Sequence, residues 1–210
     1  MEIISLHNQY EQALATAAEV LEGGGVVVVP TDTVYGLVGD ARSERVVKEM
    51  FAIKNRPAEK AFPIFVKDIP AARMIAYISD KKAQFLEKVW PGQVTVVFDH
   101  KKKLPDVLTG GMQSLGMRIP DHAFLCDLMQ HIDFPLAQTS ANISSQSPAK
   151  NRTELECYFL NASSRPDLII DGGEVAGQSS VVIDFTEDEL LVLRTGMITK
   201  EKLDQILKGF

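Results

Sequence analysis

The chain has 210 residues, of which 45% are hydrophobic and 24% charged, and its formal net charge is −6. These values predict one sizeable soluble domain, and the acidic balance disfavours a protein that binds nucleic acid over its whole surface. No apolar run is long enough to cross a bilayer, and residues 1–5 lack the pattern of a secretory signal. Two cysteines are too few for a disulfide framework. We therefore expect a cytoplasmic protein without membrane contact.

Helical and strand patterns alternate along the chain. In the first half we expect a helix over 9–22, a strand over 26–29, a helix after Ser43 that carries Val46, Val47, Met50 and Phe51, a strand over 61–66, a helix over 80–89 and a strand over 94–98. In the second half we expect strands over 114–119 and 135–138, helices over 122–131 and 154–160, closing strands over 168–170, 181–183 and 190–193, and a last helix over 200–207. Pro63 favours an edge or irregular position for its strand, because proline cannot donate to a sheet ladder.

Interleaved helices and strands are typical of an α/β fold. No internal repeat or biased linker divides the sequence, so we expect a single domain over residues 1–210.

Polar side chains gather in two neighbouring stretches. Thr31, Asp32 and Thr33 follow the apolar run 26–29 and Pro30, where α/β proteins commonly place a polar pocket. The basic run 54–60 then supplies Lys54, Arg56 and Lys60. Arginine offers a planar fork to phosphate oxygens and lysine a mobile charge, so the two stretches predict a pocket for a small polar substrate and a polyphosphate. The alternative is an ordinary basic surface turn.

Other candidate sites are weaker. Residues 172–179 have the glycine spacing of a phosphate-binding P-loop, but Gln178 stands where the lysine belongs, which leaves a turn between strands or a backbone-lined ligand loop. The run 100–103 fits a solvated turn or an RNA contact. His122 and Cys126 have helical spacing without further ligands at zinc-like spacing. No serine lies in a nucleophile elbow.

Two further groups of residues could take part in binding. Residues 139–142, Thr-Ser-Ala-Asn, follow a short apolar strand and fit either a turn or a site for a phosphate, base or carboxylate. Arg118 lies within an apolar strand and Arg194 ends another, so each needs a partner if it is buried. That partner is either a structural carboxylate or a ligand anion.

Taken in order, these motifs resemble the YrdC-type threonylcarbamoyl-AMP synthases over about residues 26–196. The resemblance rests on Pro30-Thr31-Asp32-Thr33-Val34-Tyr35-Gly36-Leu37, Lys54-x-Arg56, Trp90-Pro91-Gly92, Met117-Arg118-Ile119-Pro120, Ser140-x-Asn142, Asp171-Gly172-Gly173 and Leu193-Arg194. It implies a twisted, open mixed sheet flanked by helices around a large concave basic cavity. The chain departs from the family pattern at Phe65, Gln138 and Thr139, and it ends soon after the helix expected over 200–207. We therefore expect a short form without the further C-terminal domain of longer members.

The resemblance also implies a reaction. Such an enzyme condenses L-threonine, bicarbonate and ATP into L-threonylcarbamoyladenylate and pyrophosphate, with Mg²⁺ on the phosphates. The carbamoyl group then passes to an adenosine of certain tRNAs through partner proteins. By motif position, threonine would contact Thr33, Arg118, Gln138 and Ser179, and ATP would contact Arg56, Lys60, Ser114, Ser140, Asn142 and Arg194. Lys54 would lie on the phosphates and would be catalytic together with Arg56, and no metal ligand is expected from the protein.

The chemistry needs positive charge, because a carbamate and a polyphosphate must approach each other despite their like charge. Two alternatives stay open. One is a module that binds double-stranded RNA or tRNA without catalysis, which the acidic balance and the lack of stacking aromatics disfavour. The other is a paralogue that handles a different carbamoyl-adenylate and would accept carbamoyl phosphate in place of threonine.

Overall fold

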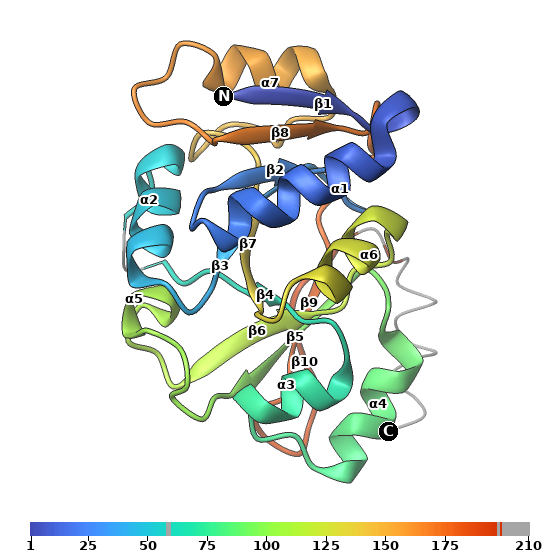
Figure 1. The fold of residues 1–210 in the computed structure, drawn as a ribbon. Coiled ribbons are helices and arrows are strands. Elements are labelled where there is room, and N and C mark those ends of the chain that lie inside the picture. The colour runs from blue at the N-terminus through green and yellow to red at the C-terminus, as the bar shows by residue number, and fades with distance from the viewer. Residues whose placement is uncertain (58–59, 197, 199–210) are drawn as a thin grey trace.

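The computed structural model describes residues 1–57, 60–196 and 198, and its centre is one mixed sheet (Figure 1). The ten strands lie in the order β1-β8-β2-β3-β7-β4-β6-β5-β9-β10. Parallel pairs join β1 to β8, β8 to β2, β4 to β6 and β5 to β9, and the other pairs are antiparallel. The expected single α/β domain with an open mixed sheet is confirmed for this part of the chain.

The bounds of the elements are as follows. The helices are α1 (Leu6–Glu22), α2 (Glu44–Lys54), α3 (Ile69–Ile75), α4 (Asp80–Val89), α5 (Asp106–Thr109), α6 (Ala123–His131) and α7 (Arg152–Phe159). The strands are β1 (Glu2–Ser5), β2 (Val27–Val29), β3 (Gly36–Asp40), β4 (Ile64–Phe65), β5 (Val94–Asp99), β6 (Ser114–Arg118), β7 (Leu136–Ser140), β8 (Leu168–Asp171), β9 (Val181–Asp184) and β10 (Leu191–Arg194).

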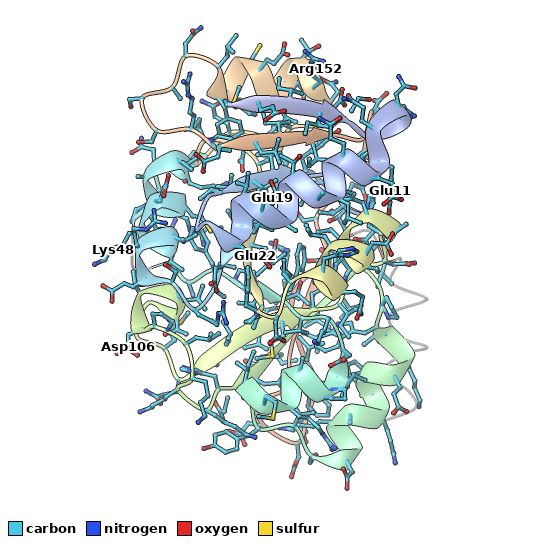
Figure 2. The ribbon with its side chains drawn as sticks, viewed as in Figure 1. Glu11, Glu19, Glu22, Lys48, Asp106 and Arg152 are labelled. Atoms are coloured by element: carbon cyan, nitrogen blue, oxygen red, sulfur yellow. The ribbon has the colours of Figure 1, made fainter. Side chains whose placement is uncertain are left out.

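Alternate residues of the strands fill two separate cores, one on each face of the sheet. Val28 and Ile169 point into a core shared with α2 and α7, whereas Val27 and Ile170 point into one shared with α1 and α6. This division follows from the two-residue period of a strand. In Figure 1, α1 and α6 lie in front of the strands, and the two helices are in contact. The opposite face of α1 carries Glu11, Glu19 and Glu22, all exposed (Figure 2).

Helix α2 ends where the basic run begins, and its caps explain why. The side chain of Ser43 accepts a hydrogen bond from Val46 N at 3.4 Å, as expected for an N-cap. At the other end Asn55 adopts a left-handed conformation with φ of 48°, and Asn55 N and Arg56 N donate to the last turn. The helix therefore stops at Lys54 and turns Arg56 away from the helix axis.

Several elements differ from the predictions. Strands β1 and β3 and helices α3 and α5 were not expected, and the helix expected over 200–207 lies outside the described residues. Of the two positions expected from Pro63, the edge is excluded because β4 lies inside the sheet between β7 and β6, and the irregular position is found. Pro63 stands just before this two-residue strand, where its carbonyl still accepts a hydrogen bond from Gln138 N at 2.9 Å. None of the described helices is both long and apolar enough to span a bilayer.

The glycine-rich segment 172–180 connects strands that lie far apart. It leaves β8, second from one edge of the sheet, and reaches β9, second from the other edge. The open alternative of a short turn between neighbouring strands is therefore wrong. Tyr35 holds the start of the segment, since its hydroxyl donates to Gly173 O at 2.7 Å and accepts from Gly172 N at 3.0 Å. A side chain at Gly172 would collide with Pro30, which explains the glycine.

Candidate functional site

The stretch after β2 forms a compact hydroxyl-rich turn. Thr31 Oγ1 donates to Val34 O at 2.7 Å and accepts from Thr33 N and Val34 N at 3.0 and 3.2 Å. Its hydroxyl also lies 2.9 Å from that of Thr33. Both threonines are buried, and the turn fixes the direction of the Thr33 hydroxyl. The sequence prediction of a polar turn at this point is confirmed.

Arg118 reaches this turn from the end of β6. Its guanidinium is 3% exposed and donates to Gly92 O at 2.8 Å, to Thr33 Oγ1 at 3.2 Å and to Asp32 Oδ1 at 2.5 Å. The prediction that a buried Arg118 needs a partner is confirmed, and that partner is the carboxylate of Asp32. Burial lowers the pKa of Arg118, and the charge of Asp32 opposes that change. Two of its five N–H groups have no partner in this arrangement, which leaves donors for a second anion.

Lys54 lies in a cage of neutral oxygens. Its side chain is buried, and Nζ donates to Ser140 O at 2.6 Å, to Asn142 Oδ1 and, at 3.4 Å, to Ser140 Oγ. Ser140 Oγ in turn donates to Asn142 Oδ1 at 2.7 Å. The structure therefore brings together three residues that the sequence assigned to one nucleotide site.

The surroundings of Lys54 disfavour its charge. Desolvation, and then the positive charge of Arg56, lower the pKa of Lys54 from an ordinary 10.5 to about 7. Burial alone lowers the pKa of Arg56, which is half-buried. A buried cation with a second positive charge nearby favours binding of an anion beside it.

Arg56, Lys60 and Ser114 form the next group. The Arg56 guanidinium lies 5.1 Å from the centre of the Phe62 ring and donates to Lys60 O at 3.3 Å and Ala61 O at 3.0 Å. Lys60 itself is exposed. Ser114 lies at the opposite end of β6 from Arg118, and its contact with ATP stays a prediction.

One segment, residues 31–36, contacts both cationic groups. Its Thr33 binds Arg118, while Gly36 pairs with Ser140 between β3 and β7. Tyr35 O accepts a hydrogen bond from Ala141 N at 2.7 Å, which holds the turn that carries Asn142. The segment therefore joins the Arg118 group to the Lys54 group, and a shared hollow between them stays a prediction.

Arg194 contacts the end of the glycine-rich segment and is a second cation near Arg118. Gly177 N donates to Thr33 O at 2.9 Å, so the segment lies over the hydroxyl-rich turn. Arg194 donates to Ser180 O at 3.0 and 3.2 Å, next to Ser179. Arg194 is exposed overall, yet partial burial of its guanidinium lowers its pKa, and its charge contributes to the lowered pKa of Arg118. The arginines thus form a second pair of cations.

Gln138 is the predicted contact with the least support from geometry. It lies on β7, two residues before Ser140 and on the same side of the strand, opposite Val38 of β3. Its side chain is partly exposed. No side-chain contact places Gln138 with Thr33 or Arg118 in the described part of the chain, so its assignment to threonine stays a prediction.

Sequence reasoning placed Asp32 in the polar turn and weighed His122 only as a metal ligand, and it assigned neither a contact. The requirement of Arg118 for a carboxylate could have identified Asp32 as its partner. His122 caps α6 without a side-chain hydrogen bond, and its Nδ1 and Asp32 Oδ2 are both buried without a partner in the described structure. Burial lowers the pKa of His122, while the charges of Asp32 and Asp121 oppose that change. Cys126, which shares a predicted helix face with His122, donates instead to Pro120 O.

Metal binding by the protein itself is not supported by the described residues, which include no group of three or more His, Cys, Asp or Glu side chains able to hold an ion. The run 100–103 is mixed rather than wholly solvated. His100 is buried and hydrogen-bonds Met112 O at 2.9 Å, whereas Lys102 and Lys103 are exposed.

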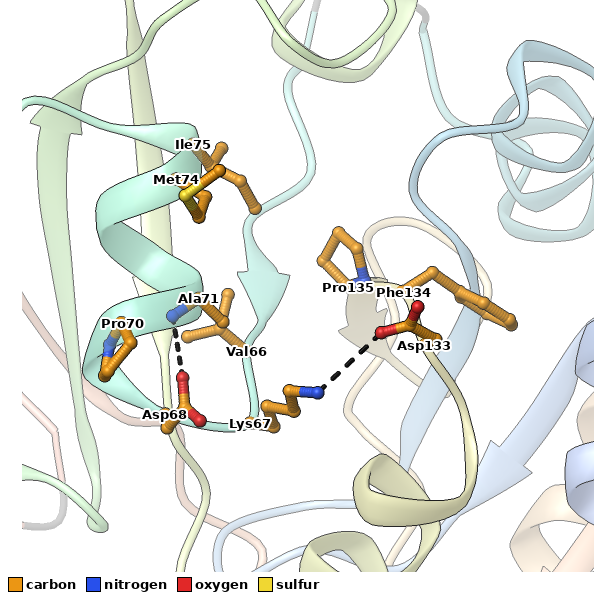
Figure 3. A pocket seen from close by; sticks show the side chains of 10 residues that line it. All are labelled: Val66, Lys67, Asp68, Pro70, Ala71, Met74, Ile75, Asp133, Phe134 and Pro135. Carbon is orange, nitrogen blue, oxygen red and sulfur yellow. Dashed lines mark hydrogen bonds and ion pairs between the residues drawn. The ribbon is translucent and has the colours of Figure 1, made fainter.

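Of two cavities in the described structure, one lies beside the site and one lies apart from it. One of about 310 Å³ is next to the Arg118 group, with Asp32, Gly92, Gln93 and Asp121 in its lining. Another, of about 440 Å³, lies between α3 and the residues before β7 (Figure 3). Its wall is mainly apolar, and Lys67 and Asp133 form an ion pair of 3.8 Å at its rim. None of the residues predicted for the site lines this second cavity.

Comparisons with known proteins agree with the motif pattern. A family model described as "Telomere recombination" and named after Sua5, YciO and YrdC matches residues 19–196. A threonylcarbamoyl-AMP synthase of Pyrococcus abyssi is 33% identical over 98% of this chain and 60% of its own length. A putative threonylcarbamoyl-AMP synthase of Methanocaldococcus jannaschii is 29% identical, and the match covers 96% of each chain.

The fold also matches solved structures. P. abyssi Sua5 complexed with L-threonine superposes with a TM-score of 0.89 at 30% identity, over 98% of this chain and 60% of that one. The chain thus spans about 60% of the length of the Pyrococcus relative. Since the family model covers most of the sequence and the same motifs build the two cationic groups, the chain belongs to the Sua5, YciO and YrdC family.

Proposed function

We propose that this chain is an L-threonylcarbamoyladenylate synthase, which condenses L-threonine, bicarbonate and ATP into threonylcarbamoyl-AMP and pyrophosphate. The observation that carries the proposal is the segment 31–36, which contacts both the Arg118 group and the cage around Lys54. Such a link puts an amino-acid carboxylate site and a polyphosphate site within reach of one another. The relatives named threonylcarbamoyl-AMP synthase, and the relative solved with L-threonine, support the same choice of substrate.

The proposed threonine site centres on Arg118. Its two unpaired N–H groups and the fixed hydroxyl of Thr33 would bind the carboxylate of the amino acid. Gln138 and Ser179 would line the same site from β7 and from the glycine-rich segment. Because Asp32 already binds one side of the guanidinium, the incoming carboxylate must approach from the other side.

The proposed ATP site extends from Lys54 to Arg194. Lys54 would lie on the phosphates, and the remaining contacts would come from Arg56, Lys60, Ser114, Ser140, Asn142 and Arg194. Mg²⁺ would arrive with the phosphates of ATP and supply further neutralising charge. Arg56 is half-buried against Phe62, so its planar fork is held ready for phosphate oxygens.

The proposed reaction needs positioning and charge more than a nucleophile from the protein. The threonine amine, once unprotonated, joins bicarbonate to give a carbamate and water. A carbamate oxygen then attacks the α-phosphorus, and the bond to pyrophosphate breaks. Lys54, Arg56 and Arg194 would lower the cost of bringing the two anions together. We further propose that the product serves tRNA modification through partner proteins in the cytoplasm.

Incubation with ATP, Mg²⁺, bicarbonate and each amino acid in turn, followed by mass analysis, tests the proposal. Of the amino acids tested, we expect only threonine to give an aminoacyl-carbamoyl-AMP. Product from carbamoyl phosphate without threonine would instead indicate a carbamoyl-transferring paralogue, and salt-dependent RNA binding without turnover would indicate a binding module.

Arg56→Ala should reduce threonine-dependent pyrophosphate release by about 100-fold or more, because it removes a cation from the developing charge. Arg42→Ala is the matched control, since Arg42 forms an exposed ion pair with Asp40 outside the site. Turnover of Arg56→Ala at the level of Arg42→Ala, with both proteins folded, would contradict the assignment.

A further inference from the structure

Lys54 is a buried amine with no anionic partner in the part of the chain that the structure describes. It is 2% exposed, and the acceptors around Nζ are a backbone carbonyl, a hydroxyl and an amide oxygen. An ammonium in such a place loses its hydration without gaining a counter-ion. The buried Arg118, by contrast, has the carboxylate of Asp32.

The groups that face Lys54 come from three directions. Strand β7 contributes Ser140, the following turn contributes Asn142, and the segment after α2 contributes Arg56. Among these only Arg56 is charged, and its charge has the same sign as an ammonium. Glu59, a carboxylate of the same basic run, lies outside the described residues and is therefore included in the test below.

The hydrogen bonds around Nζ suit an uncharged amine. A neutral amine has two N–H donors, and there are two close acceptors, Ser140 O and Asn142 Oδ1. The third contact, to Ser140 Oγ, is long at 3.4 Å, and that hydroxyl gives its own proton to Asn142 Oδ1, so it is a weak third acceptor for Nζ. The cage therefore holds the amine in place whether or not it carries the third proton.

Resting on the polyphosphate site of the proposed function, we propose that Lys54 is uncharged in the ligand-free protein in slightly alkaline solution and takes up one proton when a polyphosphate binds beside it. The balanced step joins the neutral amine, the MgATP anion and one proton from the buffer to give a bound ammonium–MgATP pair. No covalent bond forms or breaks other than the new N–H bond.

Electrostatics supplies the reason for the uptake. Burial and Arg56 lower the pKa of Lys54 to about 7 in the free protein, and an adjacent polyphosphate raises it again by attraction. Between the free and bound pKa values, binding must draw a proton from solution. Affinity for MgATP should consequently fall by up to about tenfold for each pH unit above 8.

Titration calorimetry at about pH 8 in Tris and in HEPES, two buffers with different heats of ionisation, tests the proposal. MgATP and magnesium pyrophosphate are the two probes, and threonine and bicarbonate are left out so that no turnover occurs. For the wild-type protein we expect uptake of between about half a proton and one proton per ligand bound. Lys54→Arg should bind with no uptake, because its guanidinium is always protonated.

Two variants serve as controls. Lys48→Arg changes an exposed lysine of α2 that pairs with Glu44 outside the proposed site, and Glu59→Gln removes the carboxylate that lies outside the described residues. Both should retain the proton uptake of the wild type. If Lys54→Arg fails to bind, the fall in wild-type affinity between about pH 8 and 9 decides the question.

Wild-type binding of MgATP without proton uptake, or with an affinity that does not change over this pH range, would overturn the proposal. Failure of both probes to bind would overturn it as well. A protein that takes up the proton but makes no threonylcarbamoyl-AMP would retain this inference and lose the proposed function, so the two failures can be told apart.

Discussion

Arg118 and Lys54 are two buried cations that the fold treats in different ways. Both are almost inaccessible, with exposed fractions of 3% and 2%. Arg118 lies against the carboxylate of Asp32, whereas Lys54 contacts neutral oxygens and has Arg56 as its charged neighbour. One cation is neutralised from within the protein, and the other depends on an anion from outside.

The difference means that only the Arg118 group keeps its charge and geometry without a ligand. A buried ion pair holds its geometry without a ligand, because removing either charge leaves the other uncompensated. A buried amine without a counter-ion can instead lose its proton and stay uncharged until an anion binds. With the proposed assignment, the amino-acid end of the site is thus preorganised, and the phosphate end would acquire its charge on binding.

The largest expected effect comes from Asp32→Asn. This change leaves Arg118 buried without an anion and should lower the free energy of unfolding by about 3–5 kcal/mol. Urea denaturation measures the loss. Asp40→Asn is the matched control, since the Asp40–Arg42 pair is partly exposed and its removal should cost no more than about 1 kcal/mol. Equal losses in the two variants would remove the distinction between an internal and an exposed pair.

Lys54→Met removes the cation that has no internal counter-ion, and its effect on the free energy of unfolding should depend on pH. The folded state lowers the pKa of Lys54 from 10.5 to about 7, so between these values the unfolded chain binds more protons and stability rises with pH. The free energy of unfolding of the wild type, measured relative to Lys54→Met, should rise by about 2 kcal/mol between pH 7 and 9. Lys54→Gln should give the same curve, because it also lacks the titrating amine. A difference that does not change with pH would mean that Lys54 keeps its charge in the fold.

Tyr35→Phe should have the smallest effect and should act on the Arg118 side of the site. It removes the hydroxyl that binds Gly172 N and Gly173 O, and burial raises the pKa of that hydroxyl to about 12, so it stays a donor at neutral pH. We expect a loss of about 1–2 kcal/mol of stability and faster amide exchange at Gly177, which binds Thr33 O. Unchanged exchange at Gly177 would show that the hydroxyl does not hold the segment over the turn.

The sequence predicted the regular part of the fold well, and the errors have physical causes. Strand β3 was missed because Gly36 and Gly39 lower its apparent strand propensity. A side chain at Gly39 would lie 2.5 Å from Val46 of α2, so the glycine serves helix packing instead. The irregular position expected from Pro63 is found instead of the edge, because Pro63 precedes a ladder of two residues in which its missing N–H is not needed.

The candidate site was predicted in its members but not in their contacts. The family resemblance assigned Lys54, Ser140 and Asn142 to one nucleotide site, and in the structure they are in contact. Sequence could not show that Asp32 is the carboxylate partner of Arg118, because their pairing spans 86 positions and depends on how β6 meets the turn after β2. Contacts of this kind follow from the sheet as a whole rather than from local pattern.

The parallel pairs of β8 and β9 have a consequence for synthesis of the chain on the ribosome. β1 has its sheet neighbour only in β8, and β2 and β5 each lack their second neighbour until residues 168–184 emerge. A nascent chain that stops before residue 168 would expose the free edges of β2 and β5, which favours self-association. Truncation after α7 should therefore yield insoluble material, even though the residues that form the cage around Lys54 are all present.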